Sequence, residues 1–452
     1  MRPRLALRGA LAFVCWILSA GAATAAGLPS FQALVDAAEP NSLLSPPAGS
    51  YTGPVLIDKP LDIDGRGEVK IDAGGRGSVI VLDTDGAILR NLHLSNSGSS
   101  HNDIDAGVQV RGNFNVIKDN RIDDCLFGID LQQSENNIVR RNRITSKSVD
   151  LGLRGDAIRL WYSFNNRIEE NEVVDSRDIV VWYSRDNVIR RNNASGGRYS
   201  LHFMYSQYNL VEENEFRGNS VGIFLMYSDS VTVRGNHISH AVGAAGVGIG
   251  FKETSDVEII DNEILYCAVG LHLDVSPFQP DTTNRIQGNL IAYNGIGIQF
   301  LNDWTGNLFQ DNLIEGNLTQ VAVLGGKTAK RNEWIGNHWS DYAGFDRDRD
   351  GIGDTAYEQY AYADRIWMDV PPARFFKGTP MLEVLDFLER LAPFSSPDLL
   401  LRDEQPLMSA EFRQKRQPVT GGTSNERETE SSGAPAAQPD ALEQLRRSLG
   451  RD

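Results

Sequence analysis

Residues 136–142 read NNIVRRN, and the same arrangement returns as NNRIEEN at residues 165–171, DNVIRRN at 186–192 and YNLVEEN at 208–214. The last asparagine of each motif belongs to a series with steps of 21 to 29 residues. The series comprises Asn120, Asn142, Asn171, Asn192, Asn214, Asn236, Asn262, Asn289, Asn312 and Asn337. Each unit has room for two or three short strands with alternating apolar residues, but not for a helix. This excludes helical arrays and four-stranded propeller blades. The repeat therefore predicts an all-β fold, a parallel β-helix of about ten coils, with the asparagines stacked as a hydrogen-bonded ladder.

The sequences that flank the repeat differ from it in composition. Residues 1–26 combine a basic start, an apolar run and a stretch of small residues, which is typical of a signal peptide. We expect an N-terminal cap in residues 27–50 with a short helix that starts at Phe31, and the β-helix in residues 51–340. Residues 341–406 should form a C-terminal segment with an Asp-rich loop and an apolar helix, and residues 407–452 a disordered tail.

Export and charge limit the possible partners. The apolar run in the signal peptide is too short for a membrane span, and no later stretch reaches the ~20 apolar residues that a span needs. The mature protein is therefore expected to be exported, which in a Gram-negative cell places it in the periplasm. The full sequence has 60 acidic and 44 basic side chains, which give a net charge of −16. This charge argues against binding to nucleic acid or to anionic membranes, both of which attract basic surfaces.

Two cysteines, Cys125 and Cys267, remain after removal of the signal peptide. They occupy the same column of the repeat but are six coils apart, roughly 29 Å at the spacing of neighbouring strands. A disulfide requires Cα atoms within ~7 Å of each other. We therefore expect both thiols to be reduced.

Three insertions leave the repeat at the same corner, so the loops at residues 93–105, 145–155 and 237–247 should lie along one edge of the solenoid. Insertions on one face often mark a binding side. Surface loops also tolerate insertions at little energetic cost, so this position alone does not establish a site.

Soft donor side chains come together at outward-facing positions of neighbouring coils. The repeat places His202, Met204 and Met226 within one or two side-chain lengths of each other. An imidazole with thioethers suits Cu(I), which would bind here transiently. Alternatively, these side chains form a contact patch for a partner or a covered apolar face. His237 and His240, in an insertion loop, are a second and weaker candidate pair.

Aspartates alternate through the segment after the repeat. Asp346, Asp348 and Asp350 precede a glycine and match the first ligand positions of a calcium loop, and Asp354 matches the ninth. The twelfth position holds Tyr357 in place of the bidentate glutamate, so the loop is not an EF-hand. The pattern predicts a structural Ca²⁺ site, with a solvated turn as the alternative.

The predicted C-terminal helix, residues 380–391, is unusually apolar. Seven of the eleven residues from Met381 to Leu391 are apolar, which is a wider stripe than a surface helix normally carries. We expect one side to cap the end of the β-helix and the other, with Phe387 and Leu388, to contact a membrane permease. In the alternative, both sides fold onto the β-helix.

Three C-terminal blocks carry a family resemblance: GNHWSDYAGFDRDRDGIGD at residues 336–354, RIWMDVPPARFF at 365–376 and LDFLERLAPFSSPDLLL at 385–401. With these blocks the chain, up to about Pro406, resembles the NosD family of nitrous oxide reductase maturation proteins. The resemblance implies a right-handed, periplasmic β-helix that is not an enzyme. It implies an accessory of an ATP-binding-cassette (ABC) complex that assembles the copper-sulfur centre of the reductase. The implied partners are a permease, its ATPase, a copper-carrying lipoprotein and nitrous oxide reductase. The resemblance supplies no copper ligands.

A second hypothesis is a carbohydrate-active β-helix enzyme, either a polysaccharide lyase or a uronate epimerase. In that case Trp161, Trp182 and the tyrosines that follow them would form a sugar platform. The sequence contains neither a GxSxG nor an HExxH motif. Enzymes that act on anionic polymers need a basic cleft, so the acidic charge favours the accessory protein.

Overall fold

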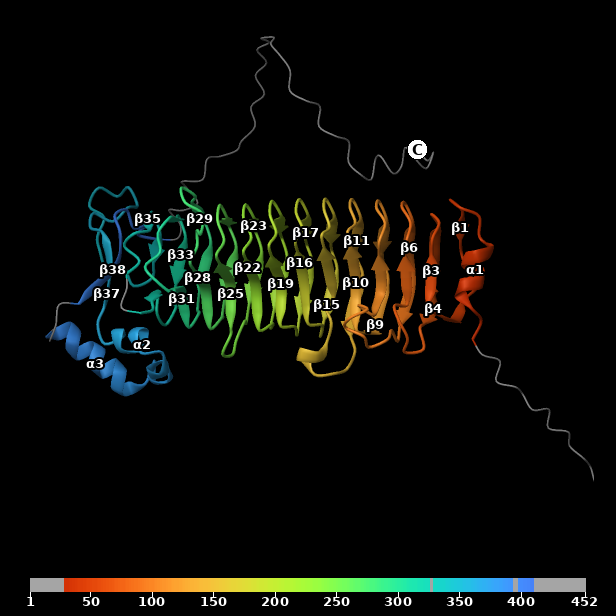
Figure 1. Ribbon diagram of the computed structural model, residues 1–452. Helices are drawn as coiled ribbons and strands as arrows, with labels where there is room; N and C mark the ends of the chain where they lie inside the picture. The colour runs from red at the N-terminus through yellow and green to blue at the C-terminus, as the bar shows by residue number, and fades with distance from the viewer. Residues whose placement is uncertain (1–27, 326–327, 393–396, 410–452) are drawn as a thin grey trace, which may run out of the picture.

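The computed structural model describes residues 28–325, 328–392 and 397–409. The predicted signal peptide, residues 1–26, lies outside this part of the chain, as does the predicted tail from residue 410 onward. The described residues form a parallel β-helix of about 13 coils, to which a C-terminal segment with helices is attached (Figure 1).

Two parallel sheets build the coils. One has 12 strands in the order β3-β5-β7-β10-β13-β16-β19-β22-β25-β28-β31-β34, and the other has 24 strands. The 12 strands are β3 (Val55–Ile57), β5 (Ile80–Leu82), β7 (Ala106–Val110), β10 (Phe127–Gln132), β13 (Ile158–Trp161), β16 (Asp178–Trp182), β19 (Tyr199–Met204), β22 (Val221–Met226), β25 (Val247–Lys252), β28 (Val269–Asp274), β31 (Ile296–Phe300) and β34 (Val321–Val323).

The 24-stranded sheet takes two strands from most coils. Its strands are β1 (Leu43–Leu44), β2 (Gly49–Thr52), β4 (Asp62–Asp72), β6 (Ile88–Ser95), β8 (Val116–Lys118), β9 (Arg121–Cys125), β11 (Ile138–Arg140), β12 (Arg143–Ser146), β14 (Arg167–Glu169), β15 (Glu172–Val174), β17 (Val188–Arg190), β18 (Asn193–Ser195), β20 (Leu210–Glu212), β21 (Glu215–Arg217), β23 (Thr232–Arg234), β24 (His237–Ser239), β26 (Glu258–Ile260), β27 (Glu263–Leu265), β29 (Asn284–Gln287), β30 (Leu290–Ala292), β32 (Asn307–Gln310), β33 (Leu313–Glu315), β35 (Glu333–Ile335) and β36 (His338–Trp339).

Apolar residues at equivalent positions of successive coils fill the interior. Ile129, Ile158 and Ile179 pair in register on β10, β13 and β16, and all three are buried. Because side chains alternate between the two faces of a strand, the residues between them point outward. The register therefore sets which side chains meet on the outer surface.

The predicted asparagine ladder is present. In each of the nine steps from Asn120 to Asn337, one side-chain amide donates from Nδ2 to Oδ1 of the next asparagine at 2.9 to 3.0 Å. At the C-terminal end, Asn337 donates from its backbone N–H and from Nδ2 to a carboxylate oxygen of Asp403, at 3.0 and 2.9 Å. A buried carboxylate therefore accepts the hydrogen bonds that the asparagine of a further coil would have accepted.

The coil count was underestimated from the sequence, which gave about ten coils where the structure has about 13. The extra coils are at the N-terminus. There the ladder column holds Gly49, Val69 and Leu92, which the strand register aligns with Asn120 through the pairs Gly49↔Val69, Val69↔Leu92 and His93↔Arg121. These coils carry no asparagine in that column, so the repeat of asparagines in the sequence does not reveal them.

The helices and the remaining strands lie at the two ends and in one loop. They are α1 (Phe31–Ala37), η1 (Leu151–Leu153), β37 (Tyr357–Ala361), α2 (Arg365–Asp369), η2 (Pro371–Phe376), α3 (Pro380–Leu391) and β38 (Asp398–Asp403). Helix α1 begins where the sequence predicted, after Ser30, whose hydroxyl accepts a hydrogen bond from Ala33 N–H at 3.4 Å.

The C-terminal end of the solenoid is not capped by α3, as the sequence had suggested. It is covered by the antiparallel pair β37–β38 and by α2. Tyr357 stacks on Trp339 of the last coil with ring centroids 4.4 Å apart, and Trp367, Leu400 and Leu401 are fully buried. Leu407, which the sequence assigned to the tail, is also fully buried and bridges to His338.

Both cysteines are free and buried, which confirms that they do not pair. Burial raises the pKa of the Cys125 thiol to about 12 and that of Cys267 to about 11. Thiols with such pKa values are protonated at neutral pH and unreactive.

Candidate metal site

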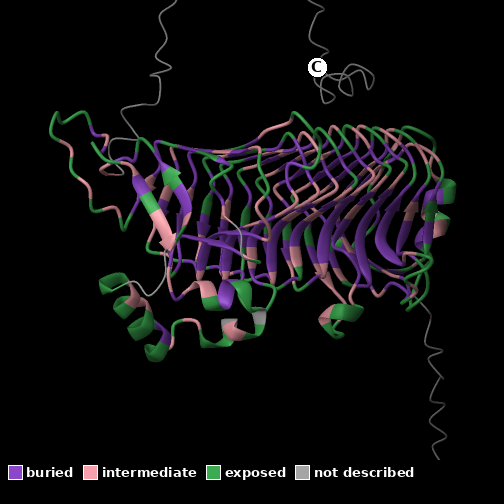
Figure 2. Ribbon diagram, turned by 60° about the vertical axis from the view of Figure 1, so that its left-hand side comes forward, coloured by how far each residue is buried: buried purple, intermediate pink, exposed green. Residues whose placement is uncertain are grey.

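The three insertion loops predicted for one edge do leave the solenoid on a common side. Figures 1 and 2 show them at the lower edge, where α2 and α3 also lie. The loop before β13 contains η1, and the loop before β25 includes residues 243–246. The outward face of the 12-stranded sheet lies next to this edge.

His202 and Met226 are in contact on that face. His202 on β19 pairs with Phe224 on β22, and Met204 pairs with Met226, so the two strands hold these side chains in adjacent rows. The distance from His202 Nε2 to Met226 Sδ is 3.1 Å. Met204 is one coil from Met226 and also pairs with Trp182 on β16. All three candidate ligands are partly buried.

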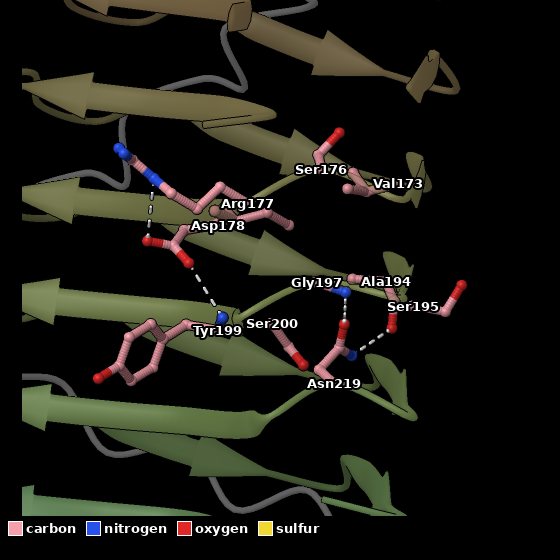
Figure 3. Close-up of a pocket in the computed structure, with 11 residues that line it drawn as sticks. Val173, Ser176, Arg177, Asp178, Ala194, Ser195, Gly197, Tyr199, Ser200 and Asn219 are labelled. Carbon is pink, nitrogen blue, oxygen red and sulfur yellow. Dashed lines mark hydrogen bonds and ion pairs between the residues drawn. The ribbon is translucent and has the colours of Figure 1, made fainter. Parts of the chain in front are cut away.

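Tyr199 orients the His202 ring. The two rings are stacked, with centroids 4.6 Å apart and planes 18° from parallel. Tyr199 donates its backbone N–H to Asp178 Oδ1 at 3.0 Å, and Asp178 in turn pairs with Arg177 and Arg198. Figure 3 shows Asp178 between Arg177 and Tyr199, with the phenol ring directed away from the interior. An ion network around the buried carboxylate of Asp178 thus fixes the residue on which His202 packs.

The surroundings keep His202 neutral. Burial lowers the pKa of the imidazole to about 4. The negative charge of Asp178 opposes this shift, and the charges of Arg198 and Arg177 add smaller lowering effects. A neutral imidazole has a nitrogen lone pair to offer a metal ion. With one or two thioethers beside it, the donor set fits Cu(I). An ion bound by both atoms requires a larger separation of His202 Nε2 and Met226 Sδ than the present 3.1 Å. The flexible side chain of methionine allows that adjustment.

The alternative pair, His237 and His240, is less suited to a metal ion. His237 is on strand β24 and not in the insertion loop that the sequence had suggested. Its Nδ1 is 2.9 Å from a carboxylate oxygen of Glu263, on the exposed surface. The His240 ring lies against Tyr266, with centroids 5.2 Å apart. Within the described residues, no histidine, His202 included, belongs to a group of three His, Cys, Asp or Glu side chains close enough to hold one ion, so the His202 site depends on its thioethers.

The Asp-rich loop contains a group of three acidic side chains that are close enough to hold one metal ion. Carboxylate oxygens of Asp346, Asp348 and Asp350 lie within 4.8 Å of one another. Asp354, the fourth predicted ligand, instead accepts the backbone N–H of Arg347 at 2.9 Å and is not in the group.

The carboxylates of this loop affect one another's protonation. Desolvation raises the pKa of Asp346, but the hydrogen bonds that it accepts, chiefly from the Gly351 and Arg349 N–H groups, together outweigh desolvation and lower the pKa. The Asp350 N–H lowers the pKa of Asp348, but the negative charges of Asp350 and Asp346 outweigh it, so the pKa of Asp348 is raised. A cation would relieve this repulsion.

The tyrosines beside the candidate site form a continuous stack. Tyr162, Tyr183, Tyr205 and Tyr227 follow one another with ring centroids 4.9, 5.1 and 4.8 Å apart and planes within 12° of parallel. Because each ring covers the face of its neighbour, the stack offers mostly ring edges and hydroxyl groups to solvent.

Helix α3 presents most of its apolar side chains to solvent, as the green ribbon in Figure 2 shows. Leu382 is buried, with 9% of its surface exposed, whereas Phe387 is 60% and Leu388 47% exposed. The alternative in which both sides of the helix fold onto the β-helix is therefore wrong. None of the helices among the described residues combines the length and apolar character needed to cross a membrane.

Comparison with known proteins places this architecture in a family. The chain is 32% identical over 385 residues to a Pseudomonas aeruginosa protein named "Probable ABC transporter binding protein NosD", a match that covers 80% of this chain and 87% of the relative. The chain belongs to the NosD family. A NosD protein of Stutzerimonas stutzeri with the same name is 35% identical over 130 residues, which is 28% of this chain and 29% of that protein.

Family models agree with this assignment. The NosD model, described as "Periplasmic copper-binding protein (NosD)", matches residues 140–344. A second model, described as a right-handed β-helix region, matches residues 67–173 and confirms the predicted handedness. The NosD match includes His202, Met204 and Met226 and stops just before the Asp-rich loop.

Among solved structures, the chain is similar to the A-modules of two mannuronan C-5 epimerases of Azotobacter vinelandii. AlgE6 has a TM-score of 0.49 and 19% identity, with 65% of this chain and 90% of the module covered. AlgE4 has a TM-score of 0.46 and 18% identity, with 66% and 93% covered.

Sequence reasoning missed the residues that position His202 in this NosD protein. Tyr199 and Asp178 stand at the start of strands β19 and β16, where the register shifts between Asp178 and Val180. That irregularity brings the Tyr199 ring over His202, although Tyr199 and His202 are an odd number of residues apart. A strict alternation of inward and outward positions cannot reveal such a contact.

Proposed function

We propose that this protein is a periplasmic accessory of an ABC transporter complex and that it holds Cu(I) transiently at His202, Met204 and Met226. In this role it serves the maturation of the copper-sulfur centre of nitrous oxide reductase. The observation that carries the proposal is the 3.1 Å contact between the neutral imidazole of His202 and the thioether of Met226. The names of the family model and of the P. aeruginosa relative, which refer to copper binding and to an ABC transporter, support it.

The partners in this proposal are the ABC permease with its ATPase, a copper-carrying lipoprotein and the reductase itself. The exposed apolar side of α3, with Phe387 and Leu388, is the contact for the permease, because so large an apolar surface is normally covered by a partner. Helix α3 carries Glu383, Asp386 and Glu389 but only one basic residue, Arg390. Helices that lie on anionic membranes are rich in lysine and arginine, so a protein partner fits α3 better than a lipid surface.

A carbohydrate-active lyase or epimerase receives less support from the site. Sugar rings stack on exposed aromatic faces, whereas the faces of Tyr183 and Tyr205 are covered by their neighbours on both sides. Trp161 and Trp182 meet edge to face at 4.9 Å and do not form a common plane.

A structural Ca²⁺ ion at Asp346, Asp348 and Asp350 is part of the same proposal. These three carboxylates converge next to the residues that close the last coil, since Gly353 N–H donates to Pro406 O and Met408 N–H donates to Gly351 O. Oxygen ligands of this kind are those that Ca²⁺ prefers.

The functional test replaces the chromosomal gene with one that encodes the variant His202→Ala, Met204→Ala, Met226→Ala. All three side chains are on the outer face, so the variant should accumulate to wild-type level in the periplasm. We expect the reductase from these cells to lack its copper-sulfur centre, measured as copper content and visible absorption. The matched control is His237→Ala, His240→Ala, which should give normal reductase. Normal reductase from the triple variant would contradict the proposal.

A further inference from the structure

A groove of about 700 Å³ lies beside the candidate copper site. Its floor is the outward face of the 12-stranded sheet, with Phe224, His272 and Gln299. One wall is the insertion loop at residues 243–246, and Phe375 of η2 contributes to the other. Among the side chains that the structure describes, no lysine, arginine, aspartate or glutamate lines this groove, although the protein as a whole is strongly acidic.

The floor of the groove leads to His202. His202, Phe224, Gly250, His272 and Gln299 pair in register on five successive strands, β19, β22, β25, β28 and β31. Four steps of ~4.8 Å give a column about 19 Å long. A Cβ on Gly250 would collide with the Phe224 ring, so the glycine leaves room for that ring over the floor.

Gln299 has a buried amide nitrogen without a hydrogen-bond partner in the described part of the chain, which favours a ligand in the groove. Its side chain is 2% exposed, and Oε1 lies 3.2 Å from His272 Nδ1. The amide nitrogen Nε2 has no hydrogen-bond partner among the described residues. A buried polar group without a partner is costly, and a ligand with hydrogen-bonding groups would remove that cost.

We infer that this groove binds an extended, uncharged, apolar peptide segment of a partner protein. A peptide main chain carries both N–H and C=O groups that can satisfy Gln299, whereas an acyl chain has none. At ~3.3 Å per residue, about six residues in an extended conformation match the length of the column. Small and apolar side chains suit the walls, which consist of alanine, valine, glycine and aromatic residues.

The position of the groove indicates which partner inserts the segment. Phe375 belongs to η2, which ends four residues before α3 begins. Phe375 is 86% exposed and can turn aside as a segment enters. A partner seated on α3 could therefore lay a segment into the groove and bring its end to His202. This inference rests on the proposed function for the identity of the partner, but binding of a peptide in the groove does not depend on copper.

A binding test can use a random heptapeptide library displayed on phage and the purified chain without its signal peptide. We expect enrichment of uncharged, apolar sequences. Ala245→Arg places a charge in the groove and should weaken the selected peptides at least tenfold. The matched control is Val242→Arg, on the same loop but outside the groove lining, which should bind as wild type does. Gln299→Leu should weaken the peptides without lowering the melting temperature, because it removes an unsatisfied group. Failure to enrich any sequence, or equal binding by Ala245→Arg and wild type, would overturn the inference.

A second experiment distinguishes a bound peptide from a bound lipid, and it tests peptide binding independently of copper binding. A photo-reactive benzoylphenylalanine at position 245, in cells that produce the native partners, should crosslink to one uncharged stretch of one protein, identified by mass spectrometry of the peptide adduct. The same group at position 242 should crosslink much less. Adducts with lipid masses would overturn the peptide inference. Cu(I) affinity measured on Ala245→Arg should equal that of wild type, so loss of copper binding and loss of peptide binding can be told apart.

Discussion

His202 is held in the protonation state that a soft metal ion requires. Burial lowers its pKa to about 4 in the folded protein, compared with ~6.5 for histidine in an unfolded chain. Between these two values the unfolded state binds a proton that the folded state does not. The free energy of unfolding contributed by this group is therefore fully present above pH ~6.5 and is lost as the pH falls toward the folded-state value.

This shift predicts a pH-dependent stability that a single substitution removes. Between pH ~7 and pH ~5 the melting temperature of the wild-type protein should fall more than that of His202→Gln, since glutamine has no titrating group. Thermal unfolding of both proteins at the two pH values measures the difference. Equal falls would mean that His202 titrates normally and is not buried as described.

Some residues of the site could be predicted and others could not. The asparagine ladder was predictable, because one residue type recurs at a fixed place in every unit and its amide can donate and accept at once. His202, Met204 and Met226 followed from the same register. Asp403 was not predictable, since it reaches Asn337 from 66 residues further along the chain and carries no local pattern.

At the level of single elements, the Asp-rich loop leads to the prediction that calcium stabilises the folded protein. A ligand at 100 times its dissociation constant stabilises the folded state by about 2.7 kcal/mol when unfolding releases it. The melting temperature should therefore rise in calcium and fall in a chelator. Asp348→Asn, which removes one converging carboxylate, should abolish the response. Asp354→Asn is the control, because Asp354 bonds to the backbone of Arg347 instead. A melting temperature indifferent to calcium would remove the ion from the proposal.

The exposed apolar side of helix α3 leads to a prediction about binding to the permease. Phe387→Glu changes an exposed side chain, so stability should change by no more than ~0.5 kcal/mol, while co-purification with the permease should be lost. Leu318→Glu is the control, because Leu318 is also apolar and is even more exposed, 81% against 60% for Phe387, but lies on the solenoid. Co-purification of Phe387→Glu at wild-type yield would contradict the assignment of α3 as the permease contact.

Helix α3 and the strand pair β37–β38 show what a local pattern can and cannot indicate. The bounds of α3 were predictable because Thr379, Pro380 and the apolar run are adjacent in sequence. Its packing was not, because the apolar stripe gives no indication of which partner covers it. The pair β37–β38 joins segments separated by α2, η2 and α3, and neither strand alternates clearly enough to predict the pairing.

At the scale of the whole molecule, the solenoid is a rigid frame that carries the site and its approaches on one side. Most coils contact their neighbours through three strands, and the asparagine ladder joins the turns from Asn120 to Asn337. The candidate copper site, the groove and α3 succeed one another along this frame toward the C-terminal end. The arrangement suits a protein that receives an ion and presents it to a partner, because the distances between these surfaces are fixed by the coils.

The most direct test of this account is a competition for Cu(I) between the purified chain without its signal peptide and a coloured Cu(I) chelator, under anaerobic conditions. The account predicts that the wild-type protein withdraws one Cu(I) per chain from the chelator. The variant His202→Ala, Met204→Ala, Met226→Ala should withdraw none, and His237→Ala, His240→Ala should behave as wild type. Equal withdrawal by the triple variant and the wild type would contradict the assignment of this site.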